Sequence, residues 1–87
     1  MATRRKLTIA DTADLMISED YIDRFRAEYH QLRDRREKLV KMITDYHAGK
    51  LNFEPDCSIE LLMYQVEVMQ HYQTILEMRA KIEKIKL

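Results

Sequence analysis

Glycine, proline, tryptophan and cysteine are scarce in this sequence. Its 87 residues contain one glycine, one proline, one cysteine and no tryptophan. Because glycine and proline mark many turns and helix ends, their scarcity favours a few long helices over a fold with many turns. The single cysteine, Cys57, excludes a disulfide within the chain and fits a reducing compartment. The prediction is a single all-α domain.

The sequence also lacks long apolar runs and an excess of either charge. Its longest apolar run, Leu61–Tyr64, is far too short to cross a membrane, and the N-terminus lacks the apolar block of a signal peptide. Fifteen basic and fifteen acidic side chains give a formal net charge of zero. Proteins that bind duplex DNA generally carry a positive excess, because they neutralise phosphates. We therefore expect a cytoplasmic protein with no membrane contact and no DNA partner.

The one clear break in the helical pattern lies between Gly49 and Pro55. A first long helix is predicted from Ser18, whose hydroxyl can cap it, to about His47. Gly49 can then adopt the left-handed conformation that commonly ends a helix.

The second long helix is predicted to begin after a cap at Asp56 or Ser58 and to continue to about Ile85. Two helices of similar length joined by a short connector should pack antiparallel. The predicted organisation is therefore an N-terminal arm or short helix over residues 1–17 and a helical hairpin over residues 18–87.

Apolar residues of the second helix form two adjacent rows. A helical hairpin needs one apolar stripe per helix, so the second row would face water unless another chain covered it. We therefore expect the hairpins to assemble into a homo-oligomer. One row comprises Leu61, Tyr64, Val68, Ile75, Met78, Ile82 and Ile85, with His71 in its remaining position, and the other comprises Leu62, Met69, Tyr72 and Leu76, in line with Gln65 and Arg79.

An arginine interrupts the apolar row of the first helix. Arg36 occupies the position between Leu32 and Leu39 where the spacing predicts an apolar side chain. One interpretation is that its methylenes lie along the row while its guanidinium reaches solvent, Glu37 or Asp34. The other is that the guanidinium lies at a helix contact and meets an external anion, for which its fork of donors is well suited.

Two further residues allow both a structural and a binding interpretation. Arg79 continues an apolar row, and it either pairs with Glu77 or Glu83 or converges with its symmetry copies on an anion. Tyr21 lies in the first turn of its helix, where its ring either packs on the N-terminal arm or stacks on a nucleobase.

The sequence contains no recognisable catalytic, metal or cofactor motif. The three histidines are not at mutual helical spacing, no glycine-rich loop could hold a phosphate, and no Ser/His/Asp or Cys/His set is visible. We therefore expect no metal ion, no cofactor and no enzymatic activity.

Two stretches, YIDRFRAEYHQLRDRREKL and LLMYQVEVMQHYQTILEMRAKI, resemble a family of small phage proteins first noted in crAss-like phages, which includes the anti-CBASS sponges. The resemblance covers residues 20–82. It implies a compact homohexamer of helical hairpins that sequesters cyclic oligonucleotides in the host cytoplasm. By holding these messengers, such a protein blocks host antiviral signalling without catalysis.

The resemblance also implies ligands and residue roles. Tyr21 matches a tyrosine that stacks on a base, and a phosphate-binding lysine falls on Arg36, or on Lys38 if the alignment shifts by two residues. Arg79 matches an arginine near a threefold axis. The first two roles imply cyclic dinucleotides such as 3′,3′-cyclic GMP–AMP (3′,3′-cGAMP), and the third implies cyclic trinucleotides.

Two alternatives are also compatible with the sequence. The chain could be a helical adaptor that binds another protein through its methionine-rich row, with Arg36 and Arg79 in structural ion pairs. It could also bind nucleic acid through residues 33–41, which carry a net charge of three positive units.

Overall fold

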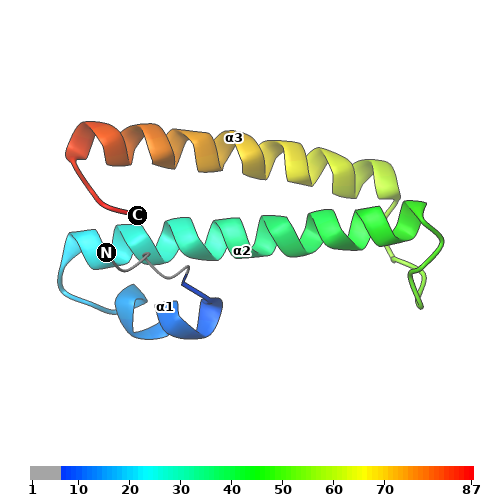
Figure 1. Cartoon of the computed structure of the whole chain (residues 1–87), viewed down its shortest axis with the longest axis horizontal. Coiled ribbons are helices and arrows are strands. Elements are labelled where there is room, and N and C mark those ends of the chain that lie inside the picture. Colours follow the sequence, from blue (N-terminus) through cyan, green and yellow to red (C-terminus); the bar gives the residue numbers. More distant parts are fainter. Residues whose placement is uncertain (1–6) are drawn as a thin grey trace, which may run out of the picture.

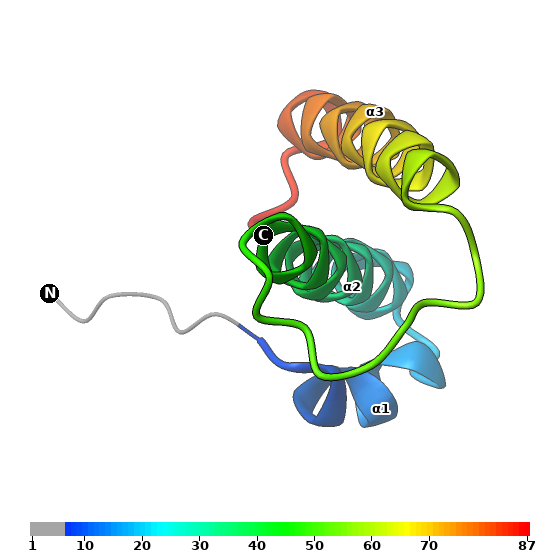
Figure 2. The same ribbon diagram turned by 90° about the vertical axis from the view of Figure 1, so that its right-hand side faces the viewer.

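The computed structural model describes residues 7–87, which form three helices and no strand. They are α1 (Ile9–Met16), α2 (Tyr21–His47) and α3 (Ile59–Glu83). α2 lies between the other two, α3 runs antiparallel to it, and α1 lies along its N-terminal half (Figures 1 and 2). The predicted all-α fold is thus confirmed. Residues 1–6, the basic start of the predicted arm, lie outside the described residues.

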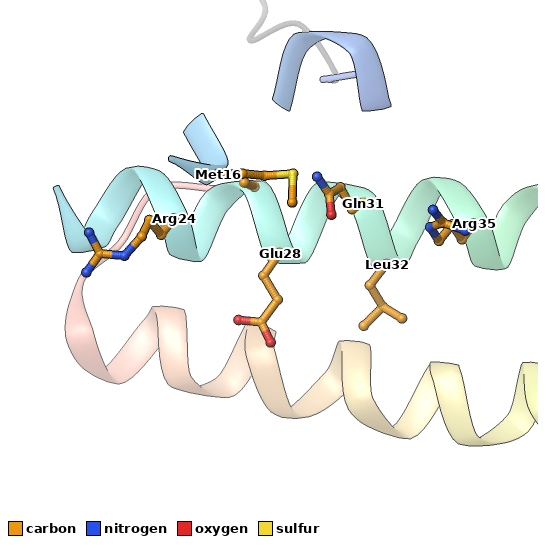
Figure 3. A pocket seen from close by; sticks show the side chains of 7 residues that line it. Met16, Arg24, Glu28, Gln31, Leu32 and Arg35 are labelled. Carbon is orange, nitrogen blue, oxygen red and sulfur yellow. The ribbon is translucent and has the colours of Figure 1, made fainter. Parts of the chain in front are cut away.

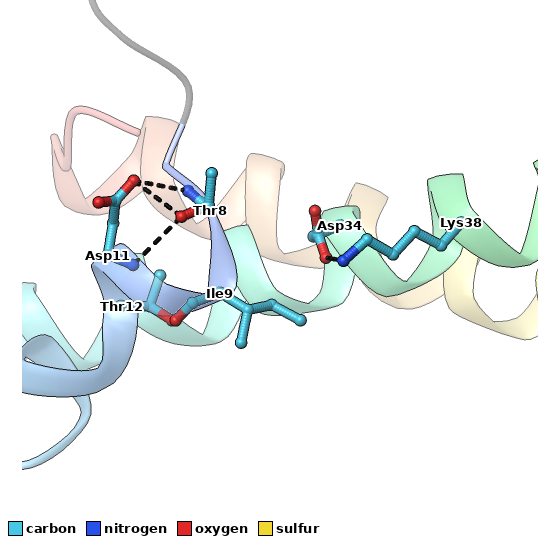
Figure 4. A network of polar contacts seen from close by, with 6 residues as sticks. All are labelled: Thr8, Ile9, Asp11, Thr12, Asp34 and Lys38. Atoms are coloured by element: carbon cyan, nitrogen blue, oxygen red, sulfur yellow. Dashed lines mark hydrogen bonds and ion pairs between the residues drawn. The ribbon is translucent and has the colours of Figure 1, made fainter.

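Polar contacts define α1 and attach it to α2. The N–H of Asp11 donates to the Thr8 hydroxyl (3.2 Å), and the Thr8 N–H donates to the Asp11 carboxylate (3.0 Å), which forms a capping box (Figure 4). Thr12 is fully buried, and its hydroxyl donates to the Ile9 carbonyl. The same hydroxyl accepts from the Gln31 amide of α2 at 3.0 Å.

The cap of α2 lies two residues later than predicted. Asp20, not Ser18, caps the helix, and its carboxylate accepts the N–H of Ile22 at 2.9 Å. The Ser18 hydroxyl instead donates to the Asp23 carboxylate (2.8 Å). Both Ser and Asp are good capping residues, so capping preference alone did not distinguish them.

The helix ends on both sides of the connector follow the prediction. Gly49 has φ +71°, a left-handed conformation that glycine adopts without strain. At the start of α3, Ser58 rather than Asp56 provides the cap by accepting the N–H of Leu61 at 3.2 Å.

The C-terminal end of α3 turns back toward α2 (Figure 1). The helix ends at Glu83, two residues earlier than predicted, because Lys84 adopts a left-handed conformation with φ +58°. The N–H of Ile85 then donates to the Ala80 carbonyl at 2.8 Å, and the Ile85 side chain is buried. This is the hydrogen bond of a Schellman-type helix end.

The core lies between α2 and α3. Within α3 the row that contains Leu76 (the inner row) contributes to it, whereas the row from Leu61 to Ile82 (the outer row) is exposed, and Ile85 reaches the core only because the chain turns back after Glu83. Leu76 of the inner row is completely buried. The outer row faces away from α2, so the predicted second apolar face is present, while its covering by another chain stays a prediction. The core consists of Phe25, Tyr29, Leu76, Ala80 and Ile85, with Leu32 and Leu87 packed against it.

Candidate functional site: cationic side chains on the helix contacts

Tyr21 and Arg79 meet at the end of the hairpin where α2 begins and α3 ends. The Tyr21 hydroxyl donates to the Glu83 carboxylate (2.8 Å) and accepts from the Arg79 guanidinium (2.9 Å). Arg79 also pairs with Glu83 at 3.3 Å and lies over the Phe25 ring, 5.1 Å from its centroid. Of the two carboxylates predicted as structural partners of Arg79, the structure selects Glu83.

The electrostatics of this cluster favour a protonated tyrosine beside a charged arginine. The hydrogen bond to Glu83 raises the pKa of the Tyr21 hydroxyl above its ordinary value. The same carboxylate raises the pKa of Arg79. Tyr21 is 44% exposed, so part of its ring remains accessible to a nucleobase.

Arg36 lies at the contact between α2 and α3, deeper in the hairpin. Its Nε donates to the side-chain carbonyl of Gln73 at 2.7 Å, and Gln73 is 6% exposed. The Gln73 amide donates in turn to Glu77 (3.4 Å), which also accepts from the Tyr29 hydroxyl (2.6 Å). Burial, followed by the hydrogen bond to Glu77, raises the pKa of Tyr29.

Arg36 has a neutral partner where the sequence suggested a carboxylate. Within residues 7–87, the ion pairs join Lys38 to Asp34, Lys41 to Asp45 and Arg79 to Glu83, and Arg36 takes part in none of them. Asp34, one of its two predicted partners, lies 2.9 Å from Lys38 (Figure 4).

Lys38 lies on a different face of α2 from Arg36. It lines a cavity of 460 Å³ between the three helices, together with Arg35. Arg35 also lines a neighbouring cavity of 390 Å³, to which Met16 contributes from α1 (Figure 3). Arg35 was not among the predicted site residues, although its place in the basic stretch 33–41 was a signal for it. Neither cavity is lined by the other three candidates, Tyr21, Arg36 and Arg79.

The four candidate residues do not form one site within a chain. Tyr21 and Arg36 are fifteen residues apart on α2, which corresponds to roughly 22 Å along the helix axis. The hairpin therefore presents separate cationic positions: one at its end, one in its centre and one on its flank. Among residues 7–87, no group of three or more metal-ligating side chains could hold a metal ion.

Fold and candidate site together define a class of protein: a small helical hairpin with cationic side chains held at helix contacts. The Sequestin family model matches residues 19–82, most of the hairpin, and the chain belongs to this family. The family name denotes proteins that sequester, which places the chain among binding proteins. No curated protein and no solved structure matches the chain. Over the described residues, no helix combines the length and the apolar character needed to cross a membrane.

Proposed function

We propose that the chain binds and sequesters cyclic di- and trinucleotide second messengers, and thereby blocks host antiviral signalling in the host cytoplasm. No covalent bond is made or broken in this mechanism. Membership of the Sequestin family supports the sequestering part. The nature of the ligand rests on the resemblance to the phage sponges and on the cationic side chains of the hairpin.

The observation that carries this proposal is the position of Arg36. Its guanidinium lies at a helix contact, donates to the neutral amide of Gln73 and takes part in no ion pair within residues 7–87. A cation at such a contact is stabilised by an anion that arrives from outside. Phosphate is the fitting anion, because two of its oxygens can accept from one guanidinium.

Tyr21 and Arg79 form the second part of the proposed site. The Tyr21 ring would stack on a base, and Arg79 would approach a phosphate of a cyclic trinucleotide. Glu83 already contacts both side chains. A bound anion must therefore displace this carboxylate or share Arg79 with it. Lys38, with Arg35 beside it, offers an alternative phosphate contact on the flank of α2.

The proposed sponge is a homo-oligomer, and the resemblance implies a hexamer. The apolar outer face of α3 supports assembly. Sequestration requires that the messenger be released slowly, since a ligand that dissociates quickly would still reach its effector.

The test is isothermal titration calorimetry with 3′,3′-cGAMP and with cyclic tri-adenylate. We expect Arg36→Ala to weaken binding of the dinucleotide roughly tenfold or more, because it removes a charge-assisted contact to phosphate. The matched control is Lys41→Ala, which removes an exposed cation that is paired with Asp45 on the same helix. The nucleotide released by heat denaturation should have an unchanged mass, as expected of a protein without catalytic activity.

The proposal is wrong if neither nucleotide produces heat or shifts the melting temperature. Equal losses of affinity in the Arg36 and Lys41 variants would show that Arg36 has no specific role in binding. The alternative, a helical adaptor, is favoured by the pairing of Arg79 with Glu83, which is the structural role it assigns to this arginine. It predicts stoichiometric capture of a host protein that nucleotides do not affect.

A further inference from the structure

The outer row of α3 follows a strict seven-residue repeat. Its members alternate three and four residues apart over three heptads, a pattern typical of a helix that packs along another helix. Among the described helices, α3 packs on α2 alone (Figure 2). The high exposure of the row places it on the side of α3 that does not contact α2. The repeat has Leu61, Val68, Ile75 and Ile82 at its first position (a) and Tyr64, His71 and Met78 at its fourth (d).

This row is too exposed to be part of the core of the single chain. Its large apolar side chains are between 49% and 77% exposed, and Ile82 is the most exposed of them. An apolar stripe of this length, interrupted only by His71, marks an interaction surface on a small protein. The occupant must be another helix, because only a helix presents side chains with the same repeat.

We propose that α3 pairs through its outer row with α3 of a second copy, in antiparallel orientation about a two-fold axis. This inference rests on the homo-oligomer of the proposed function. It adds which face of α3 forms the contact and in which direction the two helices run. It requires no nucleotide, so it can be tested separately from ligand binding.

Charges beside the row select the antiparallel orientation. In an antiparallel pair, the seventh positions (g) of the two helices face each other. The alignment that covers Ile82 sets it against Tyr64 of the second copy and sets Glu67 opposite Lys81. The two-fold axis repeats this opposite-charge pair, so it occurs twice at each interface. A shift by one heptad leaves Ile82 uncovered and sets Glu60 against Lys81 instead.

A parallel pair would lack these charge pairs. Its seventh positions face the fifth positions (e) of the other helix, so Glu67 would meet Tyr72. Lys81 would have no partner, because α3 ends at Glu83, before the next fifth position. Parallel two-stranded pairs also favour leucine at the fourth position, whereas α3 has tyrosine, histidine and methionine there.

The antiparallel alignment brings the second copy to the candidate site. Fifth positions face each other in this arrangement, which places Gln65 of one copy opposite Arg79 of the other and Tyr72 opposite its own copy at the axis. Gln65 is exposed, and Arg79 lies in the Tyr21 cluster. The ligand site at the end of the hairpin would therefore receive an amide side chain from the neighbouring chain.

The test is a charge swap, measured by sedimentation equilibrium on the full chain without nucleotide. We expect Lys81→Glu and Glu67→Lys each to weaken association roughly tenfold, because each converts two attractive pairs into repulsive ones. The double variant should recover to within about threefold of the unchanged protein, since it restores both pairs in reverse. Lys50→Glu, the same change in the exposed connector, is the control and should leave association unchanged.

Several outcomes would overturn the inference. A monomer at all concentrations, or a Lys81→Glu variant that associates as well as or better than the unchanged protein, would exclude the antiparallel pair. Rescue by Glu60→Lys in place of Glu67→Lys would exclude the proposed alignment. Circular dichroism confirms that each variant is helical. A successful swap combined with absent nucleotide binding would reject the proposed function alone.

Discussion

Tyr29 connects the two long helices through a partly buried polar contact. Its side chain is 5% exposed and its hydroxyl donates to Glu77 at 2.6 Å, so the ring belongs to the core while the hydroxyl belongs to the Arg36–Gln73 network. A buried hydroxyl that forms a hydrogen bond stabilises the fold, whereas a buried polar group that has lost its hydrogen-bond partner destabilises it. The network around Arg36 therefore depends on a residue of the core.

We predict that Tyr29→Phe lowers the free energy of unfolding by about 1 kcal/mol at neutral pH, the usual value for one hydrogen bond. Urea denaturation measures this difference. Tyr46→Phe is the matched control, because it removes a hydroxyl from an exposed tyrosine of the same helix. An equal loss in both variants would contradict a specific role of the contact between Tyr29 and Glu77.

Tyr29 should also influence stability at alkaline pH. Its pKa in the folded chain lies above the ordinary value of 10.0, so the folded state holds the proton more tightly than the unfolded state. This contribution to stability is complete below pH 10 and is lost as the pH rises through the folded pKa. In denaturation experiments at a series of pH values above 10, the free energy of unfolding should therefore fall less for Tyr29→Phe than for the unchanged protein.

Spacing along one helix predicted where Arg36 lies but not what it contacts. Its place in the apolar row put it at the helix contact, and the structure agrees. Its partner Gln73 was not among the predicted site residues, because Tyr72 already fills the position of the inner row between Met69 and Leu76. Which residues face each other across a hairpin depends on how the helices are aligned, and periodicity within one helix does not determine this.

The C-terminal end of α3 departs from the usual residue preferences of helix ends. Lys84 is the only residue other than glycine with positive φ in residues 7–87. The conformation allows the chain to turn back and bury Ile85 beside Ala80. Composition predicted the number and approximate length of the long helices, since Gly49 is near the only break. Composition did not predict the left-handed residue at the end of α3, because that conformation is typical of glycine or asparagine and not of lysine.

Replacing Lys84 by glycine should stabilise the protein. A left-handed conformation costs a residue with a side chain about 1–2 kcal/mol, which glycine avoids, while the greater freedom of glycine in the unfolded chain offsets part of this gain. We therefore expect Lys84→Gly to raise the free energy of unfolding by roughly 0.5–1 kcal/mol. The check is a higher urea midpoint with an unchanged slope.

The control for this change is Lys86→Gly, two residues farther along, where φ is not positive. It should leave stability unchanged or slightly lower. A gain of the same size at both positions would mean that loss of a lysine charge, and not the backbone conformation, causes the effect.

At the scale of the whole molecule, the separation of the candidate residues limits how a ligand can bind. Tyr21 and Arg36 are roughly 22 Å apart along α2, and Lys38 is farther from Tyr21 than Arg36 is. One cyclic dinucleotide is too small to reach both Tyr21 and Arg36 of the same chain. If both side chains contact one ligand, they must belong to two chains of the oligomer.

Complementation between two inactive variants tests this consequence. Tyr21→Ala removes the stacking ring and Arg36→Ala removes the phosphate contact, so each variant alone should bind 3′,3′-cGAMP weakly. When the two are unfolded together and refolded as a mixture, some pockets receive Tyr21 from one chain and Arg36 from another. Random assembly of equal amounts should restore about one quarter of the pockets, because each of the two chains at a pocket carries the intact residue half of the time. Calorimetry measures this fraction as the stoichiometry of tight binding, with separately refolded variants mixed afterwards as the control. Absence of restored sites would show that Tyr21 and Arg36 do not contact the same ligand.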